Sequence, residues 1–158
     1  MKKEILIDLM DLDEHSGFGE IERMYANIFS KIDIPDMHFN FLVRDKQMNT
    51  YGEKVGYLKH RSIYKVFPFL ISRHFDLWHS VHQLYRECPR NKSTKRILTI
   101  HDLNFLYEKN KKKAQKYLNA VCDKINNAHH LVAISNFAKN EVLKNCKMKE
   151  EKPFDVIL

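Results

Sequence analysis

The residues best suited to chemistry follow short apolar runs. Arg96–Ile100 is followed directly by His101 and Asp102, and the run Phe75–Ser80 contains His79 beside its end. Apolar runs of this length are typical of strands covered on both faces in a parallel sheet. Titratable side chains at the carboxyl ends of such strands lie where open α/β sheets bind ligands. A His-Asp pair in this position can contact a substrate, or it can simply form the next turn, and both interpretations stay open.

Three histidines and an aspartate provide ligand types that zinc accepts: His79, His82, His101 and Asp102. On an extended segment, however, His79 and His82 would point to opposite faces. The spacing is not typical of a metal site, so we expect no bound metal.

The three cysteines are Cys88, Cys122 and Cys146, and no two of them form a Cys-x-x-Cys pair. Their number and spacing predict neither a disulfide framework nor a zinc knuckle. Cys122 and Cys146 fall on apolar helix faces, so we expect both to be core residues.

A glycine-bearing loop, Gly17-Phe18-Gly19, stands directly before a predicted helix. Glycines let a backbone approach a phosphate closely, and the free N–H groups of a helix terminus attract the anion. The dinucleotide-binding fingerprint is not matched, because Glu22 takes the third glycine position and the loop after Asp8 is too long. Glu20 and Glu22 would also repel an anion. Glycines that only turn the chain into the helix are an equal alternative.

The elements that must position these residues alternate between strand and helix. The first helix has an apolar stripe at helical spacing, formed by Ile21, Met24, Tyr25, Ile28, Phe29 and Ile32. The predicted strands are Glu4–Leu9, Met37–Val43, Phe75–Ser80, Arg96–Ile100, His130–Ile134 and Asp155–Leu158. Three more helices are predicted: one over 62–71, which Pro68 interrupts, one over 114–125, and one from the N-cap Ser135 to about Cys146.

This alternation predicts an α/β fold, with a doubly wound, mostly parallel, Rossmann-like sheet and helices on both faces. At 158 residues the chain has the length of one domain with a proper core, so we expect a single domain over 1–158. The last predicted strand has no turn or helix after it. We therefore expect the chain to be cut from a longer protein.

The composition and net charge indicate which kinds of molecule the protein could bind. Hydrophobic residues make up 44% of the chain, the net charge is +7, and no apolar run approaches the length of a membrane span. No signal peptide is recognisable, so a cytoplasmic location is predicted. The basic charge favours an anionic partner, and a peripheral contact with the inner membrane surface stays open. Basic and aromatic residues do not alternate, so no nucleic-acid partner is expected.

Four segments in order carry a family resemblance. They are Gly17-Phe18-Gly19 before a helix, Asp76–Ser80, Thr99–Phe105 (Thr-Ile-His-Asp-Leu-Asn-Phe) and Ala128–Ala138 (Ala-His-His-Leu-Val-Ala-Ile-Ser-Asn-Phe-Ala). Together they resemble glycosyltransferase family 4, whose members are retaining, nucleotide-sugar-dependent enzymes of the GT-B fold. The resemblance covers most of the chain, is weakest over 44–74, and corresponds to the N-terminal, acceptor-side domain of such enzymes.

The resemblance implies a role for individual residues. The loop Gly17-Phe18-Gly19 would approach the donor diphosphate or the acceptor, and His79 would belong to the same donor-binding set. His101 would face the transferred sugar, with Asp102 orienting it or the following loop. Ser135 would begin a helix facing the same cleft. Where the family often has a non-acidic residue after the second glycine, this chain has Glu20, which disfavours direct phosphate contact.

The resemblance also implies what the chain needs from elsewhere. In the family a C-terminal domain of the same polypeptide supplies most nucleotide-sugar contacts, including paired glutamates. The nucleotide-sugar is then a substrate of the full-length enzyme, this domain binds no cofactor, and the fragment alone is expected to be inactive. The acceptor would be a glycan or a lipid-linked molecule, as in surface polysaccharide or lipopolysaccharide synthesis. Two alternatives stay open, a GT-B-like sugar-nucleotide epimerase and a non-catalytic, basic Rossmann-like binding module.

Overall fold

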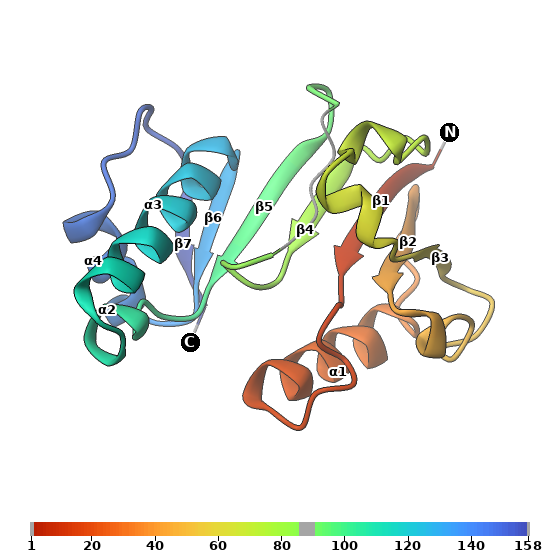
Figure 1. Ribbon diagram of the computed structural model, residues 1–158. Helices are drawn as coiled ribbons and strands as arrows, with labels where there is room; N and C mark the ends of the chain where they lie inside the picture. The colour runs from red at the N-terminus through yellow and green to blue at the C-terminus, as the bar shows by residue number, and fades with distance from the viewer. Residues whose placement is uncertain (1, 86–90, 158) are drawn as a thin grey trace. The chain divides into compact units, whose positions relative to one another are not determined.

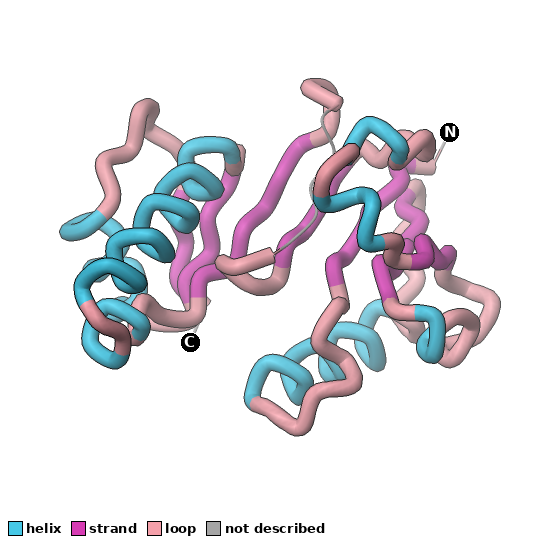
Figure 2. Tube along the Cα trace, viewed as in Figure 1, coloured by secondary structure: helices cyan, strands magenta, loops and turns pink. Residues whose placement is uncertain are grey.

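The computed structural model describes residues 2–85 and 91–157, and strands and helices alternate along it (Figures 1 and 2). The strands are β1 (Lys3–Asp8), β2 (Met37–Val43), β3 (Gly56–Lys59), β4 (Leu77–Ser80), β5 (Lys95–Ile100), β6 (His130–Ala133) and β7 (Phe154–Val156). The α-helices are α1 (Gly17–Phe29), α2 (Phe105–Glu108), α3 (Lys111–Asn127) and α4 (Asn136–Asn145). Three 3-10 turns complete the set: η1 (Asp45–Gln47), η2 (Ser62–Lys65) and η3 (Pro68–Leu70).

By their packing, the described residues divide into two compact units. The first comprises 2–81, 85 and 91–95, and the second comprises 82–84 and 96–157. In both units every strand runs parallel to its neighbours. The predicted α/β class with a parallel, Rossmann-like sheet is therefore confirmed.

The first unit contains the reversal that makes the sheet doubly wound. Its strand order is β3-β2-β1-β4, so the chain moves outward from β1 to β3 and then returns to the free side of β1. Ile7 thus pairs with Phe41 on one side and with His79 on the other. In open α/β sheets ligands bind beyond the carboxyl ends of the strands at such a reversal, which here means beyond Asp8 and Ser80.

Both faces of the first unit's sheet are covered, because side chains alternate along each strand. On one face, α1 packs against a buried cluster that contains Ile7, Phe39, Phe41 and Val43 on the strands and Leu9 directly after β1. On the other face, the crossover between β3 and β4 covers a cluster of Leu6, Met10, Leu42, Phe75 and Trp78. This two-sided burial explains why β1 contains the continuous apolar run Ile5-Leu6-Ile7.

The inner face of α1 differs from the predicted stripe. Tyr25 and Phe29 pack against the buried cluster as predicted, but Met24 and Ile28 are 61% and 50% exposed, and Gly19, Glu22 and Ala26 are buried instead. Ile32 lies beyond the helix end and is 42% exposed. The helix begins earlier than predicted, capped by Ser16, whose Oγ accepts a hydrogen bond of 3.3 Å from the Gly19 N–H. Small residues at 19 and 26 allow close packing, so the helix turns this edge inward and leaves half of the apolar stripe in solvent.

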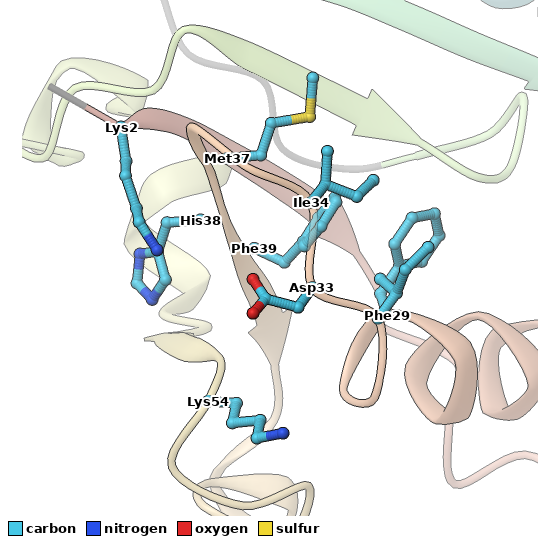
Figure 3. Close-up of a pocket in the computed structure, with 9 residues that line it drawn as sticks. Lys2, Phe29, Asp33, Ile34, Met37, His38, Phe39 and Lys54 are labelled. Carbon is cyan, nitrogen blue, oxygen red and sulfur yellow. The ribbon is translucent and has the colours of Figure 1, made fainter.

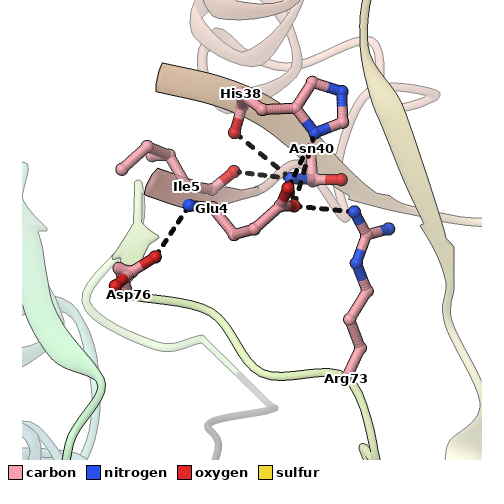
Figure 4. A network of polar contacts seen from close by, with 6 residues as sticks. All are labelled: Glu4, Ile5, His38, Asn40, Arg73 and Asp76. Carbon is pink, nitrogen blue, oxygen red and sulfur yellow. Dashed lines mark hydrogen bonds and ion pairs between the residues drawn. The ribbon is translucent and has the colours of Figure 1, made fainter. Parts of the chain in front are cut away.

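A network at the amino end of β1 holds the first unit together (Figure 4). Glu4 accepts hydrogen bonds from Asn40 Nδ2 at 2.9 Å and Arg73 Nη2 at 2.7 Å, and its Oε1 lies 3.2 Å from His38 Nδ1. Desolvation alone would raise the pKa of Glu4, but these hydrogen bonds outweigh it and the pKa is lowered. The ionised carboxylate therefore links β1, β2 and the chain that leads into β4.

The second unit is built on strands in the order β5-β6-β7. Ile100 pairs with Ala133, which pairs in turn with Val156, so the three carboxyl ends are level. Helix α3 buries Ala114, Val121 and Ile125, and α4 buries Ala138, Glu141 and Val142. Among the described residues, no helix is both long and apolar enough to cross a bilayer.

A disulfide in the second unit corrects the prediction for two cysteines. Cys122 on α3 and Cys146 at the end of α4 are bonded to each other, with their Cα atoms 5.3 Å apart. Cys146 is buried, as predicted, whereas Cys122 is only half-buried. The sequence could not reveal the bond, because spacing along the chain says nothing about two helix faces that meet in space. Cys88 lies outside the described residues.

Candidate functional site

The segment Gly17-Phe18-Gly19 forms the first turn of α1, and packing requires one of its two glycines but not the other. A Cβ on Gly19 would lie 2.0 Å from the Glu14 carbonyl oxygen and 2.9 Å from that of Asp11, so no larger residue fits. A Cβ on Gly17 would meet nothing within 4 Å. Gly19 therefore serves the turn into the helix, whereas Gly17 keeps an open backbone at its start. Phe18, between them, is half-buried.

Side chains of α1 fix the loop that precedes it. The Asp11 N–H donates a hydrogen bond of 2.7 Å to Glu22 Oε2. Arg23 Nη1 donates to the carbonyl oxygens of Leu12, at 2.7 Å, and Glu14, at 3.2 Å. These bonds run from one helical turn back to the loop, so the long connection after β1 has a defined shape.

Glu22 is a buried acid at the reversal of the strand order. Desolvation, with the nearby charges of Asp8 and Asp11, raises its pKa to about 9, and only the Asp11 N–H and Arg44 oppose the rise. Asp8, at the carboxyl end of β1, is itself buried. Glu22 is consequently uncharged at neutral pH, so the anion repulsion expected from it does not apply. Glu20 is exposed and pairs with Arg23 at 2.9 Å.

His79 lies on β4 and is packed rather than open. Its ring meets the Tyr25 ring edge-on, with the centroids 5.5 Å apart. Desolvation lowers the pKa of His79 to about 4, so the imidazole is neutral at physiological pH. These contacts favour a structural role for His79, between the sheet and α1.

In the second unit, a buried amide holds the main chain on both sides of His101. Gln83 Oε1 accepts a hydrogen bond of 3.1 Å from the His101 N–H, and Gln83 Nε2 donates one of 2.8 Å to the Asp102 carbonyl oxygen. His101 and Gln83 are 6% and 2% exposed. Gln83 therefore fixes the backbone that carries the His101 imidazole, and a catalytic side chain requires such a fixed position.

A second histidine accompanies His101. The rings of His82 and His101 lie with their centroids 5.9 Å apart. His82 Nδ1 accepts a hydrogen bond of 3.1 Å from the Leu84 N–H, which leaves the proton of the neutral ring on Nε2. Desolvation, aided by His101 and Lys124, lowers the pKa of His82 to about 4. His82 is thus a neutral hydrogen-bonding group beside His101.

The two remaining predicted residues mainly shape the chain. Asp102 Oδ1 accepts a hydrogen bond of 3.0 Å from the Asn104 N–H, the turn that was the alternative interpretation of the His-Asp pair. Ser135 is confirmed as the N-cap of α4, where its Oγ accepts a hydrogen bond of 3.1 Å from the Ala138 N–H. The Ile134 N–H bonds to the Ile100 oxygen at 3.1 Å, so the chain enters α4 at the strand edge where His101 lies.

The structure therefore separates the predicted residues into two sets. Within the first unit, Gly17, Phe18 and Gly19 begin α1, and His79 packs against the same helix through Tyr25. Within the second unit, His101, Asp102 and Ser135 follow the ends of the neighbouring strands β5 and β6.

The sequence did not lead us to expect that Asp8, Glu22 and Gln83 are buried. The sequence did contain a signal for the burial of Glu22. This residue lies three residues after Gly19 and four before Ala26, so all three residues share one face of the helix. For Gln83 there was none, because its two partners are 18 and 19 residues away along the chain.

A pocket of about 220 Å³ lies near the amino ends of β1 and β2 (Figure 3). Lys2 reaches towards His38 on its rim, and Phe29, Ile34 and Phe39 supply apolar walls. It stands at the opposite end of these strands from Asp8, where ligands of such folds do not normally bind. Within 2–85 and 91–157, no group of three or more histidine, cysteine or carboxylate side chains is placed to hold a metal ion.

Comparison with known proteins identifies no family for this chain. No protein-family model matches the chain, and no curated protein matches it either. The class that the structure defines is an α/β, Rossmann-like protein with a parallel sheet.

Proposed function

We propose that this chain is the N-terminal, acceptor-side domain of a retaining, nucleotide-sugar-dependent glycosyltransferase of the GT-B type. The observation that carries the proposal is the environment of His101. The residue follows β5 directly, its main chain is held by Gln83, and the neutral ring of His82 lies beside it. An enzyme that transfers a sugar needs a fixed hydrogen-bonding group of this kind against the reacting carbohydrate.

The surroundings of the candidate site residues support a role for each of them in this reaction. The imidazole of His101 donates or accepts a hydrogen bond at a hydroxyl of the transferred sugar. The N–H groups at the start of α4, after Ser135, offer partial positive charge towards a phosphate. At the start of α1, Gly17 leaves the backbone accessible, and the uncharged Glu22 beneath the loop does not oppose an anion.

The nucleotide-sugar is the donor substrate, and a second α/β domain of the full-length enzyme makes most of the contacts with it. The bond between the anomeric carbon and the diphosphate oxygen breaks, and the acceptor oxygen bonds to that carbon on the same face, so the configuration is retained. The leaving phosphate assists the acceptor hydroxyl, and this chain's residues position the sugar and the acceptor. The acceptor is a glycan or a lipid-linked glycan, as in the synthesis of a surface polysaccharide.

The test uses the protein of the complete reading frame with radiolabelled UDP- and GDP-sugars. His101→Ala should lower kcat by about a hundredfold, the scale for a lost catalytic hydrogen-bonding group. Thermal unfolding of the same variant is the second readout, and the exposed Lys112→Ala on α3 is the control. A loss of activity that only follows a loss of thermal stability would contradict the catalytic role of His101.

A calorimetric titration separates the alternatives. The 158-residue chain alone should bind UDP- or GDP-sugars weakly or undetectably, because a second domain holds the nucleotide. Tight binding by this chain would contradict the acceptor-side assignment. A reading frame without a second α/β domain would favour the non-catalytic binding module, and epimerised nucleotide-sugar as the product would favour the epimerase.

A further inference from the structure

The crossover between β3 and β4 exposes an apolar surface. A long helix does not form here, and η2 and η3 take its place, on the sheet face opposite α1 (Figures 1 and 2). Five large apolar side chains, which we call the crossover patch, are between 43% and 65% exposed: Ile63, Val66, Phe67, Phe69 and Leu70. Exposed apolar side chains normally occur singly, so a group of five within eight residues indicates an interaction surface.

The crossover patch stands on an ordered base. Ile71 and Leu58 pack against the buried cluster that contains Leu42 and Trp78. Arg73, near the end of the crossover, bonds to Glu4 at 2.7 Å (Figure 4). Its guanidinium lies 5.3 Å from the centre of the Phe75 ring.

Within the patch, the backbone is closed into turns, such as the 2.8 Å bond from the Phe67 N–H to the Ile63 oxygen. The Phe67 and Phe69 rings contact each other, with centroids 5.7 Å apart. The side chains are therefore exposed by a folded segment and not by a loose one.

The charged side chains of the segment that carries the patch are all basic. Residues 55–75 contain no aspartate or glutamate, but they contain Lys59, Arg61, Lys65, Arg73 and two histidines. Carboxylates from outside the segment compensate part of this charge, since Asp45 pairs with Lys59 at 2.6 Å and Glu4 pairs with Arg73. The side chain of Arg61, at the start of η2, is exposed.

A pocket beside the patch has matching chemistry. It has a volume of about 330 Å³, and Phe69 and Ile71 contribute apolar walls while Ser72, Arg73 and His74 contribute polar ones. An apolar wall next to a guanidinium and a hydroxyl suits a group that has both an acyl chain and a phosphate.

We propose that the crossover patch docks on an anionic phospholipid bilayer. The aromatic and aliphatic side chains enter the boundary between headgroups and acyl chains, and the surrounding lysine, arginine and histidine side chains face the lipid phosphates. The absence of any acidic residue over 55–75 favours a lipid surface, because a carboxylate in the contact would be repelled. This surface is distinct from the His101 cluster, and the inference stands independently of the proposed function.

Vesicle co-sedimentation tests the proposal with the 158-residue chain. It should bind vesicles that contain phosphatidylglycerol and not vesicles of phosphatidylcholine alone. Added salt should weaken the binding, because the attraction of basic side chains to anionic lipid is screened within a Debye length. No binding to either kind of vesicle would overturn the proposal.

Two pairs of variants locate the contact. Phe69→Ser should lower the vesicle partition coefficient by roughly tenfold, and Arg61→Glu by at least about fivefold. The controls are Leu143→Ser and Lys112→Glu, exposed changes of the same kind on α4 and α3, which should leave binding unchanged. All four positions are exposed, so thermal unfolding should be nearly unaffected.

Two results would overturn this assignment. Equal binding by Phe69→Ser and the unchanged protein would place any lipid contact elsewhere. A dimer in light scattering that Phe69→Ser dissociates, without vesicle binding, would make the crossover patch a protein interface.

Discussion

The Glu22 carboxyl group accepts a hydrogen bond of 2.7 Å from the backbone N–H of Asp11, and this bond joins α1 to the loop that follows β1. The acid is 3% exposed and lies near Asp8, so burial and charge both favour its neutral form. A side chain that keeps the loop in shape is therefore also a titrating group, and its protonation is coupled to folding.

Replacing Glu22 should change how stability depends on pH. The pKa rises from 4.5 in the unfolded chain to about 9 in the folded protein, so the folded state holds a proton that the unfolded state releases between these values. Below pH 4.5 both states hold this proton, so Glu22 does not make the free energy of unfolding depend on pH. Between pH 4.5 and about 9, the contribution of Glu22 to the free energy of unfolding falls by up to about 1.4 kcal/mol per pH unit.

The variant Glu22→Gln keeps an acceptor for the Asp11 N–H and removes the titration. In urea unfolding from pH 5 to pH 8, its free energy of unfolding should increase relative to that of the unchanged protein as the pH rises. Parallel curves for the two proteins would contradict the raised pKa. Glu22→Leu provides the comparison, because it also removes the acceptor and should cost about 1–3 kcal/mol at pH 5.

The two loop glycines should respond oppositely to alanine. Gly19→Ala puts a Cβ 2.0 Å from a backbone oxygen that cannot rotate away, so α1 or the loop must shift. We expect a loss of about 2–3 kcal/mol, as for overpacked sites. Gly17→Ala meets open space and restricts the unfolded chain, so thermal unfolding should show unchanged or slightly raised stability, by at most about 1 kcal/mol. Equal destabilisation by both changes would show that the helix start is not packed as described.

Replacing Gln83 should destabilise the fold, because its amide group holds the main chain on both sides of His101. Gln83→Met leaves the His101 N–H and the Asp102 carbonyl without their amide partner, at a cost of about 2 kcal/mol in chemical unfolding. Gln83→Glu retains the acceptor for the His101 N–H and loses the donor to Asp102. If the proposed function holds, both variants should lower kcat of the full-length enzyme. A Gln83→Met protein with unchanged stability would exclude the positioning role.

Reduction of the disulfide should destabilise the second unit. The bond between Cys122 and Cys146 spans 24 residues, and closing a loop of this length in the unfolded chain stabilises the fold by about 3 kcal/mol. We expect dithiothreitol to lower the unfolding midpoint of the chain and to add two thiols to those that react with an alkylating reagent after denaturation. Cys122→Ser/Cys146→Ser should show the lower midpoint without reductant. No difference between reduced and oxidised protein would argue against the bond.

The fold was predictable wherever the local pattern and the tertiary packing agree. Met37–Val43 is a strand with the predicted bounds, and Ser135 caps its helix as expected, because both signals depend on residues close in sequence. The strand Gly56–Lys59 was missed, since it is short and half-buried and pairs only with β2. The helix expected near 62–71 is replaced by two 3-10 turns, because Pro68 lacks the N–H that a continuous helix requires.

The candidate site was predictable in part. The position of His101 beyond a buried strand followed from the apolar run that precedes it. Its partners, His82 and Gln83, come from another segment, and no periodicity indicates which loop reaches which strand end. The burial of Glu22 depended on which face of α1 turned inward, and that face combines the small residues Gly19 and Ala26 with only part of the apolar stripe.

The place of β1 between β2 and β4 has a consequence for biosynthesis. The strand is made first, yet its second partner, Leu77–Ser80, leaves the ribosome only after most of the first unit has been synthesised. Until then one edge of an apolar strand has no native neighbour and can pair with another chain. Such long-range pairing also slows folding. The nascent chain should thus be most prone to aggregation, and most dependent on chaperones, before residue 80 has emerged.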